Sequence, residues 1–85
     1  MKFKAEIEVM PHDALLDPQG KAVGHGLQQM GYSQIEHVRV GKHIRLEIEA
    51  ETEAAAHSAV HEACEKLLAN PIMESFRFSL HPVSA

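Results

Sequence analysis

Residues 17–31 read DPQGKAVGHGLQQMG, which is the pattern of a helix with both ends marked. Asp17 suits the N-cap position, because its carboxylate can accept hydrogen bonds from the free N–H groups of the first turn. Pro18 suits the first helical position, and Gly31 suits the position after the last turn, where the backbone often turns left-handed. The segment therefore predicts a helix between a loop and a second turn.

Three apolar side chains of this segment, Val23, Leu27 and Met30, follow one another at intervals of four and three residues, with Gly26 on the same side. That spacing places them on one face of a helix. An amphipathic helix in a small domain buries such a face against a neighbouring element. We therefore expect this stripe to pack on the rest of the chain.

Outward from this helix the sequence predicts one strand before it and two after it. Residues 2–9 alternate between apolar and charged side chains, which is typical of a strand with one face in the core and one in water. The next two predicted strands cover residues 35–40 and 43–50, with Gly41-Lys42 as the turn between them.

A second helix is expected at residues 53–69, capped by Thr52. It ends at Asn70-Pro71, because proline disfavours helical backbone in the residue before it. Its apolar stripe consists of Ala56, Val60, Ala63, Cys64, Leu67 and Leu68.

A last strand at residues 73–80 completes the order β-α-β-β-α-β, and the tail from Pro82 onward is expected to fray. We therefore predict an α+β, ferredoxin-like fold over the single domain 1–85: a four-stranded antiparallel sheet with two helices on one face. The first and third strands are central neighbours in this topology. Complementary charges predict their register, with Lys2 opposite Glu49, Lys4 opposite Glu47 and Glu6 opposite Arg45.

The composition indicates a small cytoplasmic protein that binds neither nucleic acid nor membrane. The 85 residues are 45% hydrophobic and 24% charged, with a net charge of −4. A negative chain lacks the basic surface that nucleic acids and anionic lipids require. One cysteine cannot form an internal disulfide, which favours an intracellular setting, and no apolar run is long enough to span a bilayer.

His57, His61 and Cys64 are the strongest candidate metal ligands, since they share one side of the second helix. We favour the simpler interpretation, in which Cys64 is a core residue flanked by the two imidazoles. A buried mid-helix thiol is also a poor nucleophile. No metal site and no catalytic residue are predicted on this chain.

Other reactive patterns are weaker. Gly41-Lys42 lacks the upstream glycine and the following serine or threonine of a phosphate loop. The outward carboxylates of the strands are expected to be solvated rather than to act as acid and base: Glu6, Glu8, Glu47 and Glu49. The same strand faces carry no aromatic residue, which disfavours an RNA-recognition domain.

The glycines of the first helix have two explanations. An interior glycine costs about 1 kcal/mol relative to alanine, so its presence indicates close approach of another backbone. That backbone belongs either to a partner or to this chain's own sheet, and the sequence does not separate the two.

Taken together, these segments resemble the PurS family, the small subunit of phosphoribosylformylglycinamidine synthase in purine biosynthesis. The resemblance covers nearly the whole chain in order. The matching stretches are 16–20, 22–23, 31–32, 38–42, 46–49 and 64–74. The histidine enrichment and the glycines at 24 and 26 are not family signatures.

The resemblance implies a subunit of a glutamine- and ATP-dependent carbon–nitrogen ligase that has no complete active site of its own. The synthase converts formylglycinamide ribonucleotide to the amidine with ammonia released from glutamine. In the family a glutaminase subunit makes the ammonia and a large synthetase subunit activates the substrate. The small subunit joins them, typically as a homodimer, and ATP and magnesium are expected on the synthetase subunit.

We expect the partner-binding surface in the loop before the first helix and around the predicted turn. Its candidate residues are Leu16, Asp17, Pro18, Gln19, Gly20, Arg39, Gly41 and Lys42. Asp17 and Pro18 also serve the helix start, whereas no helix requires Gln19. The alternative function is a small-molecule or metal-binding regulatory module of the same fold.

Overall fold

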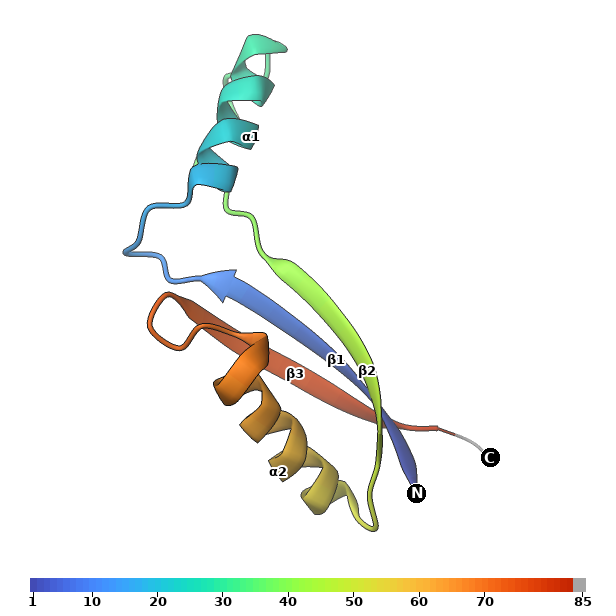
Figure 1. Cartoon of the computed structure of the whole chain (residues 1–85). Coiled ribbons are helices and arrows are strands. Elements are labelled where there is room, and N and C mark those ends of the chain that lie inside the picture. Colours follow the sequence, from blue (N-terminus) through green and yellow to red (C-terminus); the bar gives the residue numbers. More distant parts are fainter. Residues whose placement is uncertain (84–85) are drawn as a thin grey trace.

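The computed structural model describes residues 1–83 and shows an elongated molecule with a sheet at one end and a projecting helix at the other (Figure 1). The elements are β1 (Lys2–Pro11), α1 (Pro18–Gln29), β2 (Lys42–Glu49), α2 (Glu53–Ala63), the π-helical turn η1 (Cys64–Leu68) and β3 (Glu74–Pro82). The sheet is antiparallel, with β1 between β2 and β3. Neither helix of these residues is long and apolar enough to cross a lipid bilayer.

The predicted register of the central strands is confirmed. Lys2 lies opposite Glu49, Lys4 opposite Glu47 and Glu6 opposite Arg45. Arg45 Nε is 3.3 Å from Glu6 Oε1, so the outward charges pair across the strands as their signs require. Exposed pairs of this kind contribute roughly 0.2–1 kcal/mol each, which biases the register without holding the sheet together.

The core lies between β1 and α2. The inward side chains of β1 are fully buried, and so are the predicted core residues Ala56, Val60 and Cys64 of α2 and η1. The inward residues of the two outer strands are only half-buried: Ile44, Leu46, Ile48, Phe76, Phe78 and Leu80. One helix thus covers the middle of the sheet and leaves part of its apolar face open.

The prediction of a fourth strand, at residues 35–40, is wrong. Residues 35–40 form no strand, although the prediction placed one there. The backbone turns left-handed at His37, with φ of 56°, and the chain then passes Gly41 directly into β2 without a hairpin. A Cβ atom at Gly41 would collide with the carbonyl oxygen of Val9, so glycine is required where the chain crosses the end of β1.

The position of α1 also differs from the prediction. Its caps are as expected, with Gly31 at φ of 96°, but the helix projects beyond the end of the sheet and does not cover it (Figure 1). Val23 and Met30 of the apolar stripe are therefore 46% and 73% exposed, and Leu27 is half-buried. The expectation that this stripe packs on its own sheet is wrong.

The second helix ends differently from the prediction because its last turn is π-helical. The N–H of Ala69 donates to the carbonyl of Cys64, five residues earlier, which adds a residue to the turn and changes the direction of the following side chains. Ala69 is buried, whereas Leu67 is 83% exposed instead of lying on the apolar stripe. At the other end of β3, Pro82 pairs with Phe3 rather than fraying.

Candidate partner-binding site

The carboxylate of Asp17 joins two distant parts of the chain. Oδ1 accepts a hydrogen bond from the N–H of Gly20 at 3.0 Å, which is the predicted N-cap contact. Oδ2 accepts from the N–H of Val40 at 2.8 Å, just before the chain enters β2. One side chain therefore fixes both the start of α1 and the end of the segment that returns from it.

Arg39 fixes the preceding loop from the opposite side. Its Nη2 donates to the carbonyl of His12 at 2.6 Å and its Nη1 to the carbonyl of Leu15 at 3.1 Å. Its Nε lies 3.9 Å from Asp17 Oδ2 and is buried without an acceptor among residues 1–83. The guanidinium thus spans the loop between β1 and α1.

This arrangement keeps Asp17 ionised. The hydrogen bonds from the N–H groups of Gly20 and Val40 and the nearby charge of Arg39 lower the pKa of the Asp17 carboxyl, although desolvation opposes them. Donors that point at a carboxylate favour its charged form. The Asp17 carboxylate therefore stays charged, with its oxygens already hydrogen-bonded within the chain. It is unsuited to proton transfer at neutral pH.

Four of the predicted contact residues have side chains that face solvent, and Gly41 is exposed beside them. Leu16 is 70% exposed, and Pro18, Gln19 and Lys42 are exposed as well. Lys42 Nζ lies 3.9 Å from Glu74 Oε2 at the start of β3. A partner could reach all four side chains without a rearrangement of the chain.

The other predicted residues lie beneath this surface or support it. Asp17 and Gly20 are buried and Arg39 is half-buried. A Cβ atom at Gly20 would collide with the carbonyl oxygen of Val38, so this glycine admits the chain's own returning segment. Of the two explanations for the glycines, close approach within the chain applies to Gly20, but the neighbour is this segment and not the sheet.

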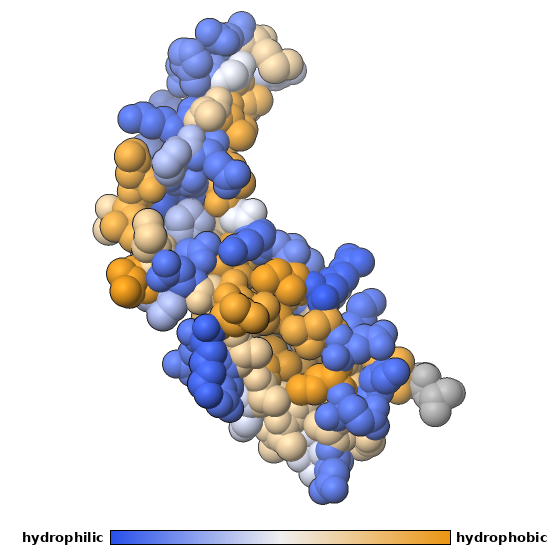
Figure 2. All heavy atoms as spheres, in the orientation of Figure 1, coloured by the Kyte–Doolittle hydropathy of each residue, from blue (hydrophilic) through white to orange (hydrophobic). Residues whose placement is uncertain are grey.

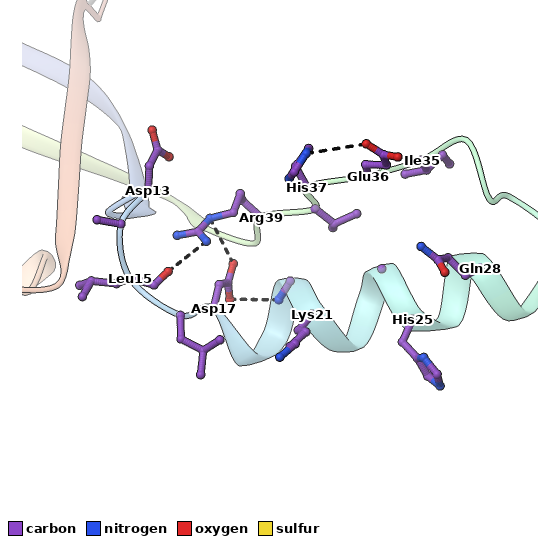
Figure 3. Close-up of a pocket in the computed structure, with 15 residues that line it drawn as sticks. Asp13, Leu15, Asp17, Lys21, His25, Gln28, Ile35, Glu36, His37 and Arg39 are labelled. Atoms are coloured by element: carbon purple, nitrogen blue, oxygen red, sulfur yellow. Dashed lines mark hydrogen bonds and ion pairs between the residues drawn. The ribbon is translucent and has the colours of Figure 1, made fainter.

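An open groove runs between α1 and residues 35–39 (Figure 3). Its walls mix Asp13, Lys21, Glu36 and His37 with apolar side chains, and Arg39 and Asp17 close one end. Its cationic side chains, Lys21 and Arg39, are balanced by the carboxylates of Asp13, Asp17 and Glu36, so the groove does not favour a phosphate. It is also open rather than an enclosed apolar pocket. Its geometry suits an extended protein surface better than a nucleotide.

The chain matches one family along almost its entire length. The family model that matches, over residues 4–82, is PurS, described as phosphoribosylformylglycinamidine (FGAM) synthase. The chain belongs to the PurS family. The PurS subunit of this synthase from Bacillus subtilis is 40% identical over 83 residues, which cover 98% of each chain. That from Synechocystis is 41% identical over 78 residues, which cover 92% of this chain and 78% of the relative.

Solved structures of PurS proteins share the same elongated fold. PurS from Bacillus subtilis superposes with a TM-score of 0.83 at 38% identity, over 94% of this chain and 99% of the other. A chain from the structure of PurLQS from Thermotoga maritima superposes with a TM-score of 0.85 at 33% identity, over 95% of this chain and 99% of the other. The projecting helix is therefore shared with relatives.

The candidate metal ligands of the second helical segment are His57 and His61 of α2, which are exposed at the edge of the core, and Cys64 of η1. The ring of His57 is tilted against that of Phe78, with centroids 4.8 Å apart, and that of His61 lies edge-on to Phe76 at 5.4 Å. Cys64 is buried. Within residues 1–83, no three His, Cys, Asp or Glu side chains are arranged to hold a metal ion.

Sequence reasoning missed the bracing role of Arg39. Its hydrogen-bond acceptors are backbone carbonyls, which any residue at positions 12 and 15 supplies. Part of this role is visible in the sequence, because an arginine between Val38 and Val40 must be either paired or exposed. Its acceptors are backbone carbonyls, so no particular residue type marks their positions.

Proposed function

We propose that this chain acts as the small, non-catalytic subunit of phosphoribosylformylglycinamidine synthase, where it holds a glutaminase subunit and a synthetase subunit together. The observation that carries the proposal is the match to the PurS family over residues 4–82. Support comes from the superposition on a chain of the PurLQS structure from Thermotoga maritima over 95% of this chain.

The chain contributes position rather than chemistry. Its carboxylates on the sheet are paired with cations, its thiol is buried and its groove is open. A connector that fixes two active sites relative to each other lets ammonia pass between them without loss to solvent, because it replaces diffusion with a fixed geometry. ATP and magnesium belong on the synthetase subunit in this proposal.

The contact surface consists of the exposed residues Leu16, Pro18, Gln19 and Lys42. The buried Asp17 and Gly20 and the half-buried Arg39 hold the loop under them in one conformation. A rigid loop loses little conformational entropy when it binds, which favours affinity. Gly41 acts indirectly, since it lets the chain pass the end of β1 and so sets the position of Lys42.

The small subunit works as a homodimer. The apolar residues of β2 are only half-buried and the stripe of α1 is exposed to water. Large exposed apolar patches mark association sites, so a second copy of the chain can bury these residues. Two copies also give a bridge two equivalent surfaces, one on each chain.

Reconstitution of the three-subunit enzyme tests the proposal. The chain should copurify with both partner subunits, and omitting it should abolish glutamine-dependent synthesis while synthesis from added ammonium chloride persists. Gln19→Ala combined with Lys42→Ala should weaken assembly and lower glutamine-dependent activity at least about tenfold, equivalent to about 1.4 kcal/mol. The matched control is Gln29→Ala with Lys66→Ala, since both residues are exposed and lie outside the contact surface.

Two results would count against the proposal. Full glutamine-dependent activity without this chain would remove its role as a connector. Unchanged assembly of the Gln19/Lys42 variant, with its fold verified by circular dichroism, would place the contact surface elsewhere.

A further inference from the structure

Two imidazoles on neighbouring turns of α2 have no part in the proposed function. His57 and His61 are four positions apart, which places them on one side of the helix, one turn from each other. Their rings are almost parallel, with an interplanar angle of 14° and centroids 6.4 Å apart. Among the seven histidines, these two are the pair that one helix holds at this spacing.

Both rings are packed on the core from one side only. Phe78 and Phe76 of β3 contact the rings of His57 and His61, yet both histidines are exposed, and the His61 side chain is 51% exposed. Figure 2 shows hydrophobic residues gathered over the lower part of the molecule, where the sheet and α2 lie, with hydrophilic residues around them. The phenylalanines thus restrict where the rings lie, and an ion can reach the rings from solvent.

Glu65 acts on the second imidazole of the pair. Its Oε1 lies 2.7 Å from His61 Nδ1, one helical turn further along the chain. A carboxylate beside one ring nitrogen keeps the proton of a neutral imidazole on that nitrogen, so the lone pair of Nε2 is left free. Histidines that bind metal ions commonly have a carboxylate in this position. The contact with Glu65 therefore prepares His61 Nε2 as a ligand.

Cys64 lies apart from this pair. Its thiol is buried, whereas the two imidazoles are exposed. The three residues that share one side of the helix in the sequence are therefore divided by the structure into a core thiol and a surface pair. This division agrees with the finding that no three ligand side chains within residues 1–83 are arranged around one point.

We propose that His57 and His61 together chelate a divalent transition metal ion of the class that prefers imidazole ligands, such as Zn²⁺, Ni²⁺ or Cu²⁺. Each ring supplies one nitrogen, Glu65 is a positioning residue for His61, and water fills the remaining coordination positions. Metal–nitrogen bonds of about 2.1 Å place the centres of two coordinated rings roughly 4.5–5.5 Å apart. The exposed rings need to approach each other by about 1–2 Å from their separation in this structure.

An ion held in this way links two turns of the helix that covers the sheet. The unfolded chain does not hold the two imidazoles at a fixed spacing, so the ion binds the folded chain more tightly. By mass action, such binding raises the midpoint of thermal unfolding. The site is independent of the bridging function, which copurification with the partner subunits measures separately.

Zinc binding to the untagged full-length chain provides the first test, measured by competition with a chromophoric chelator. The original chain should bind one Zn²⁺. His57→Gln and His61→Gln should each weaken binding at least about tenfold, and the double variant should bind no more weakly than either, because losing one imidazole already destroys the chelate. The matched control is His25→Gln, which removes another exposed helical histidine and should leave the affinity unchanged.

The spacing provides the second test. His61→Gln combined with Glu62→His keeps seven histidines but moves the second imidazole to another side of the helix. This variant should bind Zn²⁺ as weakly as His61→Gln, with far-UV circular dichroism unchanged. Glu65→Gln should weaken binding at least about threefold with both imidazoles in place, whereas an unchanged affinity would contradict the role given to Glu65.

Thermal unfolding gives a readout that does not depend on the chelator. Saturating Zn²⁺ should raise the unfolding midpoint of the original chain by at least about 3 °C and should leave that of His57→Gln unchanged. An original chain that binds no Zn²⁺ would overturn the proposal. So would an affinity that His25→Gln lowers as much as His57→Gln, or one that the relocated histidine retains, because binding would then reflect the number of histidines and not the pair.

Discussion

Asp17 accepts a hydrogen bond from the backbone N–H of Val40 at 2.8 Å, across 23 positions of the chain. The same carboxylate caps α1 through Gly20. The start of α1 and the entry to β2 are therefore held together, and this contact fixes the point from which α1 projects.

Replacing Asp17 with asparagine should lower the free energy of unfolding. An asparagine side chain has one carbonyl oxygen, so it can accept from Gly20 or Val40 but not from both on separate oxygens. It also removes the charge near Arg39. Urea unfolding followed by far-UV circular dichroism at one protein concentration measures the loss. Equal midpoints for the two proteins would contradict the role given to the second oxygen.

The effect of Asp17 should depend on pH in a defined direction. Its pKa in the folded protein is lowered from the ordinary value of 3.8, so its contribution is fully present above that value and is lost as pH falls through the folded pKa. The stability difference between the original chain and Asp17→Asn should be constant at neutral pH and shrink below about pH 4. A difference that grows on acidification would contradict this sign.

Two glycines of α1 should respond oppositely to alanine. Gly20→Ala should lower the free energy of unfolding, because its Cβ would collide with the carbonyl oxygen of Val38 and approach Asp17 Oδ2 at 2.6 Å. Gly26→Ala meets nothing within 4 Å and should raise the free energy of unfolding by about 0.5–1 kcal/mol, the usual gain in a helix interior. Thermal unfolding of both variants measures the contrast.

The sequence predicted those features of the fold that depend on local patterns. Alternation located β1, the capping residues located both helix starts at Asp17 and Thr52, and charge complementarity gave the register of β1 and β2. Each of these depends on neighbours in the chain or on one strand pair, so the pattern and its cause lie in the same stretch.

The errors concern how distant parts of the chain meet, which local patterns do not determine. The apolar stripe of α1 predicts a buried helix face and the apolar residues of 35–40 predict a strand, but neither pattern says which other element would supply the contact. Gly41-Lys42 was interpreted as a hairpin turn because glycine favours turns, whereas Gly41 is needed for close passage beside Val9. Likewise, the spacing of the second helix assumed 3.6 residues per turn, and η1 breaks that period before Leu67.

The structure separates the predicted contact residues into two groups that the sequence does not distinguish. Leu16, Gln19 and Lys42 are exposed as a contact surface requires, whereas Asp17, Gly20 and Arg39 are bound to the backbone of the same chain. Sequence similarity marks both kinds of residue alike, and only the hydrogen bonds distinguish them.

The π-helical turn predicts a contrast between two apolar residues of the second helical segment. Val60 is 1% exposed and Leu67 is 83% exposed. Val60→Ala should cost about 2 kcal/mol through lost burial and a residual cavity, whereas Leu67→Ala should stay within about 0.5 kcal/mol in the isolated chain. Urea midpoints measure both. A large loss at Leu67 would restore the uninterrupted α-helix of the sequence prediction.

The Cys64 thiol should react only slowly in the folded protein. It is buried at the start of η1, and burial raises the pKa of its thiol by desolvating the thiolate. Since the thiolate is the reacting species, and the thiol is reached only when the packing around Val60 and Ile7 opens, labelling by a thiol-specific disulfide reagent should be at least about a hundredfold slower in buffer than in urea. Val60→Ala, which loosens the same packing, should speed the labelling, while Leu67→Ala should not. Rapid labelling of the original chain would show that Cys64 is accessible and would reopen its reactivity as a question.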